Sequence, residues 1–140
     1  MSFVIDASAT LPWRFEDEAT PWTEALLDRA EQGEELVVPA HWALEVANGL
    51  LMALRRKRVT AEQVSEFTED LAALAIVSEP ADSPARWTAI IGLAQEYRLT
   101  VYDAAYIELA RRADLPLASL DRALIDAARA AGVDTIPTQA

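Results

Sequence analysis

The chain has 140 residues, 52% of them hydrophobic, so it is long enough and apolar enough to bury one sizeable core. It contains no cysteine, which excludes disulfides and thiolate metal sites and fits a reducing cytosol, so we expect a cytoplasmic protein. Its formal net charge of −11 argues against a simple polyanion-binding surface, because such surfaces generally carry a basic patch.

No segment suggests export or membrane insertion. The apolar run of residues 3–5 ends at Asp6, which is too early for a signal peptide. No stretch reaches the roughly 18 apolar residues that a membrane helix needs. The chain also lacks repeats, linkers and low-complexity segments, so we expect one domain over residues 1–140 and no membrane partner.

Short β-rich runs alternate with helical patterns along the chain. Five strands are predicted, at residues 3–5, 36–38, 75–77, 117–120 and 133–136. Helices between them are predicted to start after capping signals at Thr20-Pro21, Thr60 with Gln63, Ser83-Pro84 and Thr100 with Asp103. Gly33 and Gly132 stand where helices should end. This alternation predicts an α/β fold of three layers, with a mostly parallel sheet covered by helices on both faces.

Two acids follow predicted strands directly. In parallel sheets, ligands bind beyond the carboxyl ends of the strands. Asp6 comes after the first strand and Asp121 after the fourth, so both should lie at that edge. Each has a simpler alternative, because aspartate is a favoured N-cap of the helix that would follow.

A third acid, Glu45, lies in an otherwise apolar helical stretch at residues 42–51, where only Asn48 joins it one turn later. A lone carboxylate in such a helix is unfavourable unless a cation or a donor meets it, and the alternative is an exposed helix position. Gly49 weakens the helix by about 1 kcal/mol, which suggests that something approaches this face closely.

The fourth acid, Asp103, stands in the first turn of a predicted helix, where aspartate is favoured for purely structural reasons. Considered together, the four acids predict a cation site. Oxygen ligands of this kind suit Mg²⁺ or Mn²⁺, and such ions ionise water and neutralise charge on a phosphodiester. Without metal, the like charges should raise one another's pKa values.

The order of these motifs resembles a known family. FVIDASA at residues 3–9 is similar to the opening motif of PIN domains, in which an Asp ends the first strand and a Ser follows. Glu45, Asp103 in LTVYDAAY (99–106) and Asp121 in ASLD (118–121) match the other PIN acids in order and spacing. The resemblance runs from Phe3 to about Pro137.

The resemblance implies roles for individual residues. It makes Asp6, Glu45 and Asp103 the most regular catalytic, metal-binding acids, with Asp121 as a more variable fourth. Ser8 would support the first acid, and Ser119 stands where many relatives have Thr, so its hydroxyl should play the same hydrogen-bonding part. Asn48 would be a supporting residue rather than a ligand.

For small members of the family, such as the VapC toxins of bacterial toxin–antitoxin pairs, the resemblance implies Mg²⁺- or Mn²⁺-dependent cleavage of RNA, a homodimer and inhibition by a cognate antitoxin. Two other α/β classes fit less well. A haloacid-dehalogenase phosphatase needs a second Asp where Ser8 stands, and a receiver domain needs a late Lys, whereas Lys57 is the only lysine. A non-catalytic PIN-like binding module stays as the alternative, although such modules usually lose an acid.

Other polar and aromatic features have two interpretations. The basic run could contact RNA or could stabilise a helix C-terminus; its members are Arg55, Arg56, Lys57 and Arg58. Core or interface packing is favoured over base stacking for the tryptophans, and those on the early helices could line an antitoxin groove; the four are Trp13, Trp22, Trp42 and Trp87. His41, the sole histidine, is favoured as structural over a proton shuttle.

Overall fold

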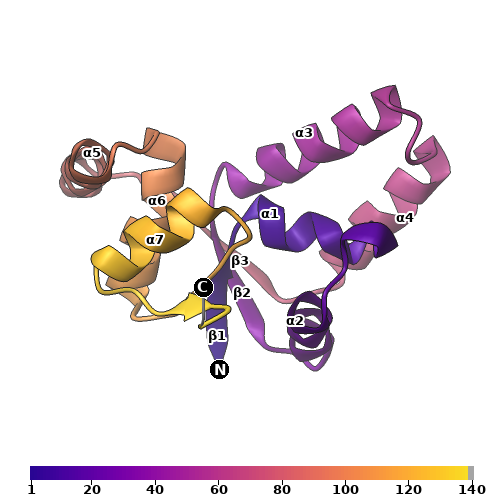
Figure 1. Cartoon of the computed structure of the whole chain (residues 1–140), viewed down its shortest axis with the longest axis horizontal. Coiled ribbons are helices and arrows are strands. Elements are labelled where there is room, and N and C mark those ends of the chain that lie inside the picture. The colour runs from indigo at the N-terminus through magenta and orange to yellow at the C-terminus, as the bar shows by residue number, and fades with distance from the viewer. Residues whose placement is uncertain (139–140) are drawn as a thin grey trace.

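The computed structural model describes residues 1–138. Its centre is a five-stranded, all-parallel sheet in the order β3-β2-β1-β4-β5. The strands are β1 (Ser2–Ile5), β2 (Glu35–Pro39), β3 (Ile76–Glu79), β4 (Leu117–Ala118) and β5 (Thr135–Ile136). Helices α1 to α4 lie on one side of the sheet and α5 to α7 on the other (Figure 1), which confirms the predicted three-layer α/β fold. The expected domain of residues 1–140 includes 139 and 140, which lie outside the described residues.

The helices are bounded largely as their capping signals predict. They are α1 (Ala7–Thr10), the 3₁₀ helices η1 (Leu11–Trp13) and η2 (Glu16–Glu18), α2 (Pro21–Glu31), α3 (Trp42–Arg55), α4 (Ala61–Ala72), α5 (Pro84–Tyr97), α6 (Val101–Ala113) and α7 (Arg122–Ala130). Thr20 and Thr60 form capping boxes, and Ser83 and Thr100 accept from the first turns of α5 and α6. Over residues 1–138, the helices all fall short of the length and apolarity that membrane crossing requires.

Strand ends are where the sequence prediction errs. β4 stops at Ala118 rather than at residue 120, because Ser119 and Asp121 turn the chain into α7. β5 begins at Thr135, two residues later than predicted, and β3 runs from Ile76 to Glu79 rather than over residues 75–77. The backbone N–H of Ser119 still donates to Ile136 O at 3.2 Å, so the sheet edge extends one residue beyond β4.

The core explains why the acids are held firmly. β1 is buried on both faces, with Phe3, Val4 and Ile5 fully inaccessible. Helix α6 packs against β1, β2 and β4, and the residues 104–110 are all buried. Because the middle of α6 is buried directly after Asp103, the position of Asp103 is fixed by a helix that is anchored in the core.

Three of the four tryptophans pack as predicted. Trp42 is buried and donates to Thr10 Oγ1 at 3.2 Å, while Trp13 donates to Thr23 O at 2.8 Å and, like Trp22, packs on the core. Trp87 differs, because 52% of it is exposed on α5. The close approach predicted at Gly49 is internal: an added Cβ would lie 2.5 Å from Leu11 Cδ1.

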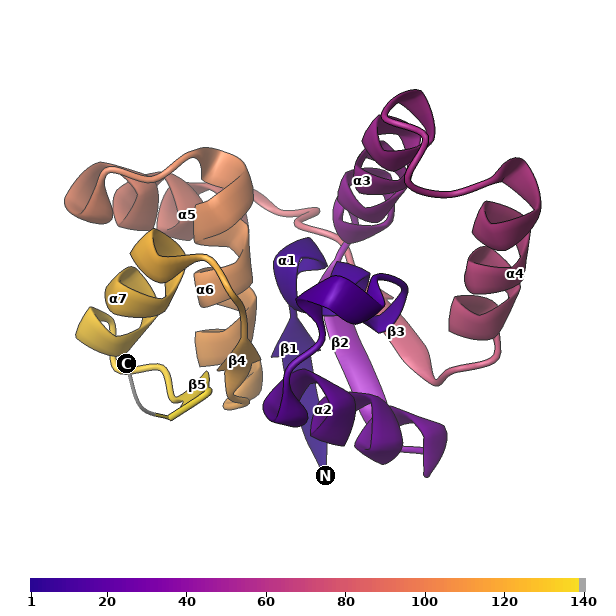
Figure 2. The same cartoon turned by 45° about the vertical axis from the view of Figure 1, so that its right-hand side comes forward.

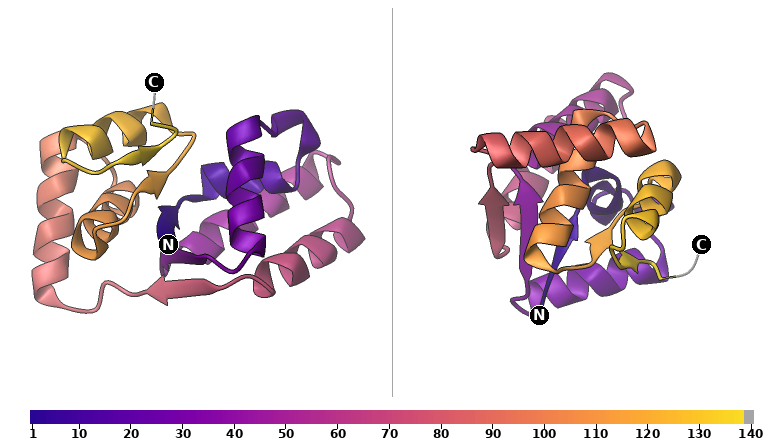
Figure 3. Two further views of the ribbon diagram at one scale, coloured as in Figure 1. Left: turned by 90° about the horizontal axis from the view of Figure 1, so that it is seen from below. Right: turned by 90° about the vertical axis from the view of Figure 1, so that its left-hand side faces the viewer.

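The strand order places a crevice beside β1. The chain moves outward from β1 to β2 and β3, crosses to the other side of the sheet through α5 and α6, and returns as β4 on the far side of β1 (Figures 2 and 3). The order therefore reverses between β1 and β4, and ligands of such sheets bind at the carboxyl ends of the strands at that point. Asp6 and Asp121 follow these two strands.

Candidate active site

Asp6 is tied down by donors from both strands at the switch point. It is only 6% exposed; its Oδ1 accepts from Ser8 Oγ at 2.7 Å and from Ala9 N at 3.1 Å, and its Oδ2 accepts from Ser119 Oγ at 2.6 Å. The bond to Ala9 makes Asp6 the N-cap of α1. Capping and membership of the acid cluster, posed as alternatives by the sequence, are therefore compatible.

The electrostatics of Asp6 are dominated by its burial. Removal from water disfavours the charged carboxylate and raises the pKa of Asp6 to about 6, although the hydrogen bonds from Ser119, Ser8 and Ala9 act in the opposite direction. The nearby negative charge of Asp121 adds to the increase. Asp6 therefore binds a proton at a higher pH than an ordinary aspartate does, and a cation beside it would lower its pKa again.

Ser119 and Ser8 connect the end of β4 to the end of β1. Ser119 Oγ accepts from Asp121 N at 3.0 Å while it donates to Asp6, and Ser8 Oγ accepts from Leu120 N at 2.8 Å. Asp121 Oδ1 in turn accepts from Leu124 N at 3.2 Å and caps α7. Both serines therefore donate to the carboxylate of Asp6 and join the ends of β1 and β4.

Glu45 has a partner that the sequence analysis missed. Tyr106, only 1% exposed on α6, donates its hydroxyl to Glu45 Oε1. Burial, then the hydrogen bond to Glu45 and the charges of Glu45, Asp6 and Asp103, raise the pKa of Tyr106 above its ordinary value, so it is a neutral donor. The available signal was its position three residues after Asp103, on the same helix face.

His41 stands beside this pair and is held by packing. Its Nε2 lies 3.0 Å from Tyr102 O and 3.8 Å from Glu45 Oε1, and its ring meets Tyr102 and Tyr106 edge-on. These contacts favour the predicted structural role. They also link α3, which carries Glu45, to the start of α6.

Asp103 lies near two of the other acids, Asp121 and Glu45. Partial burial raises its pKa first, followed by the negative charges of Asp121 and Glu45, while Thr100 and His41 lower it. Asp121 also acts on Asp6. The structure therefore brings the four predicted acids, from four different elements, into one region, where the charge of Asp121 acts on Asp6 and Asp103 and the charge of Glu45 acts on Asp103.

The present arrangement of side chains is not a finished metal site. Within residues 1–138, no three Asp, Glu, His or Cys side chains are placed so that they could hold one ion. Asp6, Glu45 and Asp121 are each engaged with donors. A carboxylate has about four lone-pair positions, so these bonds leave capacity for a cation. Asn48 is exposed, and within the described residues no hydrogen bond joins it to the acids.

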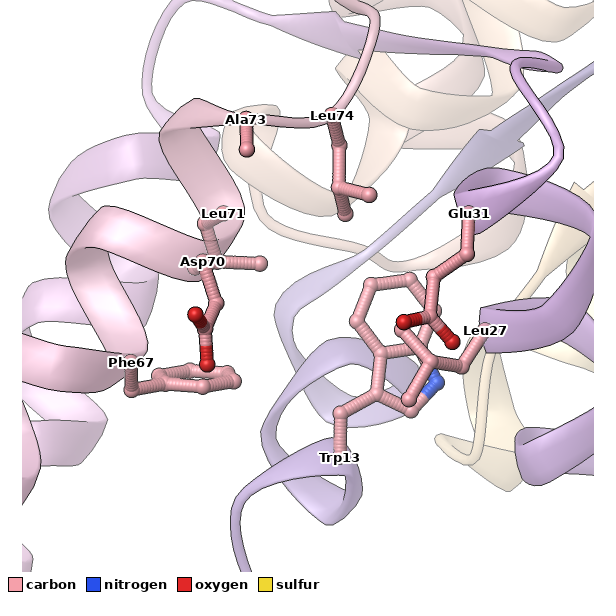
Figure 4. A pocket seen from close by; sticks show the side chains of 8 residues that line it. All are labelled: Trp13, Leu27, Glu31, Phe67, Asp70, Leu71, Ala73 and Leu74. Atoms are coloured by element: carbon pink, nitrogen blue, oxygen red, sulfur yellow. The ribbon is translucent and has the colours of Figure 1, made fainter.

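Two surface hollows beside α4 contain none of the four acids. One of about 390 Å³ is lined by side chains of η1, α2 and α4 and the turn after α4, including Trp13, Leu27, Phe67 and Asp70 (Figure 4). A second, mainly apolar hollow of about 280 Å³ lies between α3 and α4, where Trp42 and Leu71 contribute. Both border α4.

The family model described as PIN domain matches residues 3–130. The chain belongs to the PIN-domain family. The matched region contains all four acids and both serines, so the PIN resemblance noted from the motifs is confirmed as family membership.

One curated protein and two solved structures are similar to this PIN domain over nearly its whole length. Ribonuclease VapC3 of Pyrobaculum aerophilum is 29% identical over 126 residues, which are 90% of this chain and 94% of that protein. The crystal structure of PAE2754 from Pyrobaculum aerophilum aligns with a TM-score of 0.71 at 23% identity, over 99% of this chain and 94% of the other. FitAcB from Neisseria gonorrhoeae aligns at 0.63 and 18% identity, over 96% of both chains. These two structures support the fold alone.

Proposed function

We propose that this PIN domain is an endoribonuclease that cleaves RNA phosphodiester bonds with Mg²⁺ or Mn²⁺, and that it is the toxin of a VapBC-type toxin–antitoxin pair. The observation that carries the proposal is the gathering of four acids near the strand switch point, where the charge of Asp121 raises the pKa of Asp6 and Asp103 and the charge of Glu45 raises that of Asp103. An uncompensated group of carboxylates is unfavourable, so its presence favours cation binding. The named relative, a VapC ribonuclease, supports the choice of RNA.

The donor set fits this metal. All four side chains offer oxygen, which Mg²⁺ and Mn²⁺ prefer, so Asp6, Glu45, Asp103 and Asp121 would hold it. When bound, such an ion would make a water molecule more acidic and neutralise charge on the phosphodiester. In our proposal Ser8 and Ser119 orient Asp6, and Tyr106 orients Glu45. Asn48, exposed one turn after Glu45 on α3, is a supporting residue and not a ligand.

The alternative is a non-catalytic PIN-like module that binds nucleic acid or protein. It predicts the same fold, but it gives no reason to keep four carboxylates in one region. The buried Asp6 is the sharpest argument, because a binding module would be more stable with a neutral residue there. We therefore favour the enzyme.

The partners follow from the same proposal. A VapB-type antitoxin would insert an Arg or Lys among the acids, since a cationic group compensates them as a metal does. Its apolar residues would pack over the hollows that contain Trp13 and Trp42, which agrees with the groove expected from the sequence. A homodimer and a cytoplasmic location complete the proposal.

The test is a single substitution with a matched control. Asp103→Asn should abolish Mn²⁺-dependent RNA cleavage and leave the circular dichroism spectrum unchanged, since losing a ligand removes several kcal/mol of transition-state stabilisation. Asp114→Asn, at the other end of α6 where Asn also tolerates the left-handed conformation (φ 54°), should cleave like wild type. Retention of more than about a tenth of the wild-type rate in Asp103→Asn would refute the assignment.

Thermal melts add a readout that does not depend on turnover. In EDTA, Asp103→Asn should unfold at a higher temperature than wild type, because it relieves like-charge repulsion. The expected increase in the free energy of unfolding is on the order of 1 kcal/mol. Millimolar Mn²⁺ should stabilise wild type and Asp114→Asn but not Asp103→Asn, since only a competent site gains stability from binding. Equal stabilisation of all three would place Asp103 outside the metal site.

A further inference from the structure

The basic run at the end of α3 divides into two parts. Arg58 is committed to the fold: it bonds to Asp17 and Glu18 at 2.9 to 3.2 Å, and its guanidinium lies 4.5 Å from the centre of the Phe15 ring. Arg55, Arg56 and Lys57 are exposed, and among the ion pairs within residues 1–138 none includes them. Apart from the favourable position of cations near a helix C-terminus, no ion pair within the described residues uses these three charges, so they are available to a ligand.

The same helix carries an acid of the candidate site. Glu45 lies in the first turn of α3, and Arg55 and Arg56 lie at its end. Eleven residues separate Glu45 from Arg56, which corresponds to a rise of about 16 Å and a rotation of about 20°, so the two lie along nearly the same side of the helix. Between Glu45 and Arg55, α3 carries no other acid. Figure 2 shows α3 as a straight arm that leads away from the sheet.

The backbone conformation of Lys57 ends helix α3. Lys57 has φ of 59°, a left-handed conformation that glycine adopts without strain and lysine does not. Arg98 and Asp114 adopt the same conformation at the ends of α5 and α6, so at Lys57 it marks the end of α3, and the exposed side chain lies beyond the last helical turn.

We propose that Arg55, Arg56 and Lys57 form a phosphate anchor for single-stranded RNA, which lies along α3 from the acid site to this end of the helix. The inference rests on the proposed function and states how its substrate is held. The distance along α3 from Glu45 to Arg56 corresponds to about five nucleotides of a stacked strand, at about 3.4 Å per nucleotide. The anchor also answers the charge problem, because it offers local cations on a chain of net charge −11.

The experiment measures the affinity of a labelled, mixed-sequence single-stranded RNA of about 20 nucleotides by fluorescence anisotropy in EDTA, over a range of KCl concentrations. The test variant is Arg55→Gln with Arg56→Gln. The matched control is Arg98→Gln with Arg111→Gln, which removes the same charge from exposed positions at the ends of α5 and α6. We expect the test variant to weaken binding at least fivefold at low salt and to reduce the slope of log Kd against log salt by about 1.4, at about 0.7 per phosphate contact. The control should change neither.

Single variants separate the anchor from helix stabilisation. Lys57→Gly should weaken RNA binding without lowering the melting temperature, whereas Arg58→Gln should lower the melting temperature and leave the salt slope unchanged. If wild type does not bind the RNA, or if the test and control variants bind alike, the proposal is wrong. Displacement of the RNA by polyglutamate at equal charge would also overturn it, in favour of an acidic protein ligand.

The same preparations distinguish this inference from the proposed function. Mn²⁺-dependent cleavage of the same RNA by wild type is measured in parallel. Binding that depends on Arg55 and Arg56 without any cleavage would retain the anchor and refute the ribonuclease. Cleavage of the RNA, with an affinity that does not depend on Arg55 and Arg56, would retain the ribonuclease and refute the anchor.

Discussion

Asp6 and Glu45 receive serine and tyrosine hydroxyls in very different surroundings. Asp6 is 6% exposed, follows a central strand and accepts three hydrogen bonds. The side chain of Glu45 is 36% exposed, stands on a helix and receives the single hydroxyl of Tyr106. Water can replace a lost donor at Glu45 but not at Asp6. The first acid is therefore part of the fold, while the second is a partly exposed side chain on a helix.

The positions of the two acids are fixed by different parts of the fold. The donors to Asp6 come from the ends of β1 and β4 and from the first turn of α1, so its position follows from the sheet. The donor to Glu45 comes from α6, 61 residues away, so its position depends on how α3 and α6 pack. Substitutions at the two donors should therefore have unequal effects on stability, and the predictions below test that inequality.

The largest effect is expected from Ser119→Ala. The substitution removes the 2.6 Å bond to Asp6 Oδ2 and the acceptor of Asp121 N, and it leaves a buried carboxylate short of a donor. Such a loss costs about 2 kcal/mol, or a fall in melting temperature of roughly 6 °C. Ser65→Ala, on the exposed side of α4, is the control and should change stability by less than about 0.5 kcal/mol. A fall no larger than that of the control would show that Asp6 does not depend on Ser119.

The next effect concerns pH in the metal-free protein. The pKa of Asp6 is raised from 3.8 to about 6, chiefly by burial, with Asp121 facing it. The folded state therefore binds more protons than the unfolded state between these values, so stability falls as pH rises through the range. From pH 7.5 to 5 in EDTA, wild type should gain on the order of 1 kcal/mol relative to Asp6→Asn. Denaturant melts at both pH values measure this difference, and parallel curves for the two proteins would contradict it.

The sequence allowed more of the Asp6 side to be predicted than of the Glu45 side. Asp6, Ser8, Ser119 and Asp121 follow strands, and their hydrogen bonds are mostly local or cross between paired strands, so pattern and order sufficed. Tyr106 escaped because a contact between two helices distant in the chain leaves no periodic signal.

The basic run and Trp87 were ambiguous for a related reason. Which arginine pairs with η2, and which tryptophan remains exposed, depends on tertiary packing. The predicted end of β4 was wrong because side-chain hydrogen bonds of Ser119, not strand propensity, turn the chain there. The helix starts succeeded because capping is a local interaction within a few residues.

The smallest effect is expected from Tyr106→Phe, and it is the most direct test of the comparison. The substitution removes the only hydroxyl that donates to Glu45 among the described residues, yet the free carboxylate can turn to water through its exposed side. The buried ring of Tyr106 is retained, so little packing is lost. We expect a loss below about 1 kcal/mol, at most half that of Ser119→Ala measured in the same buffer. Equal losses from the two substitutions would mean that Glu45 is as dependent on its donor as Asp6, and the division between a fold-determined and a solvent-accessible acid would be wrong.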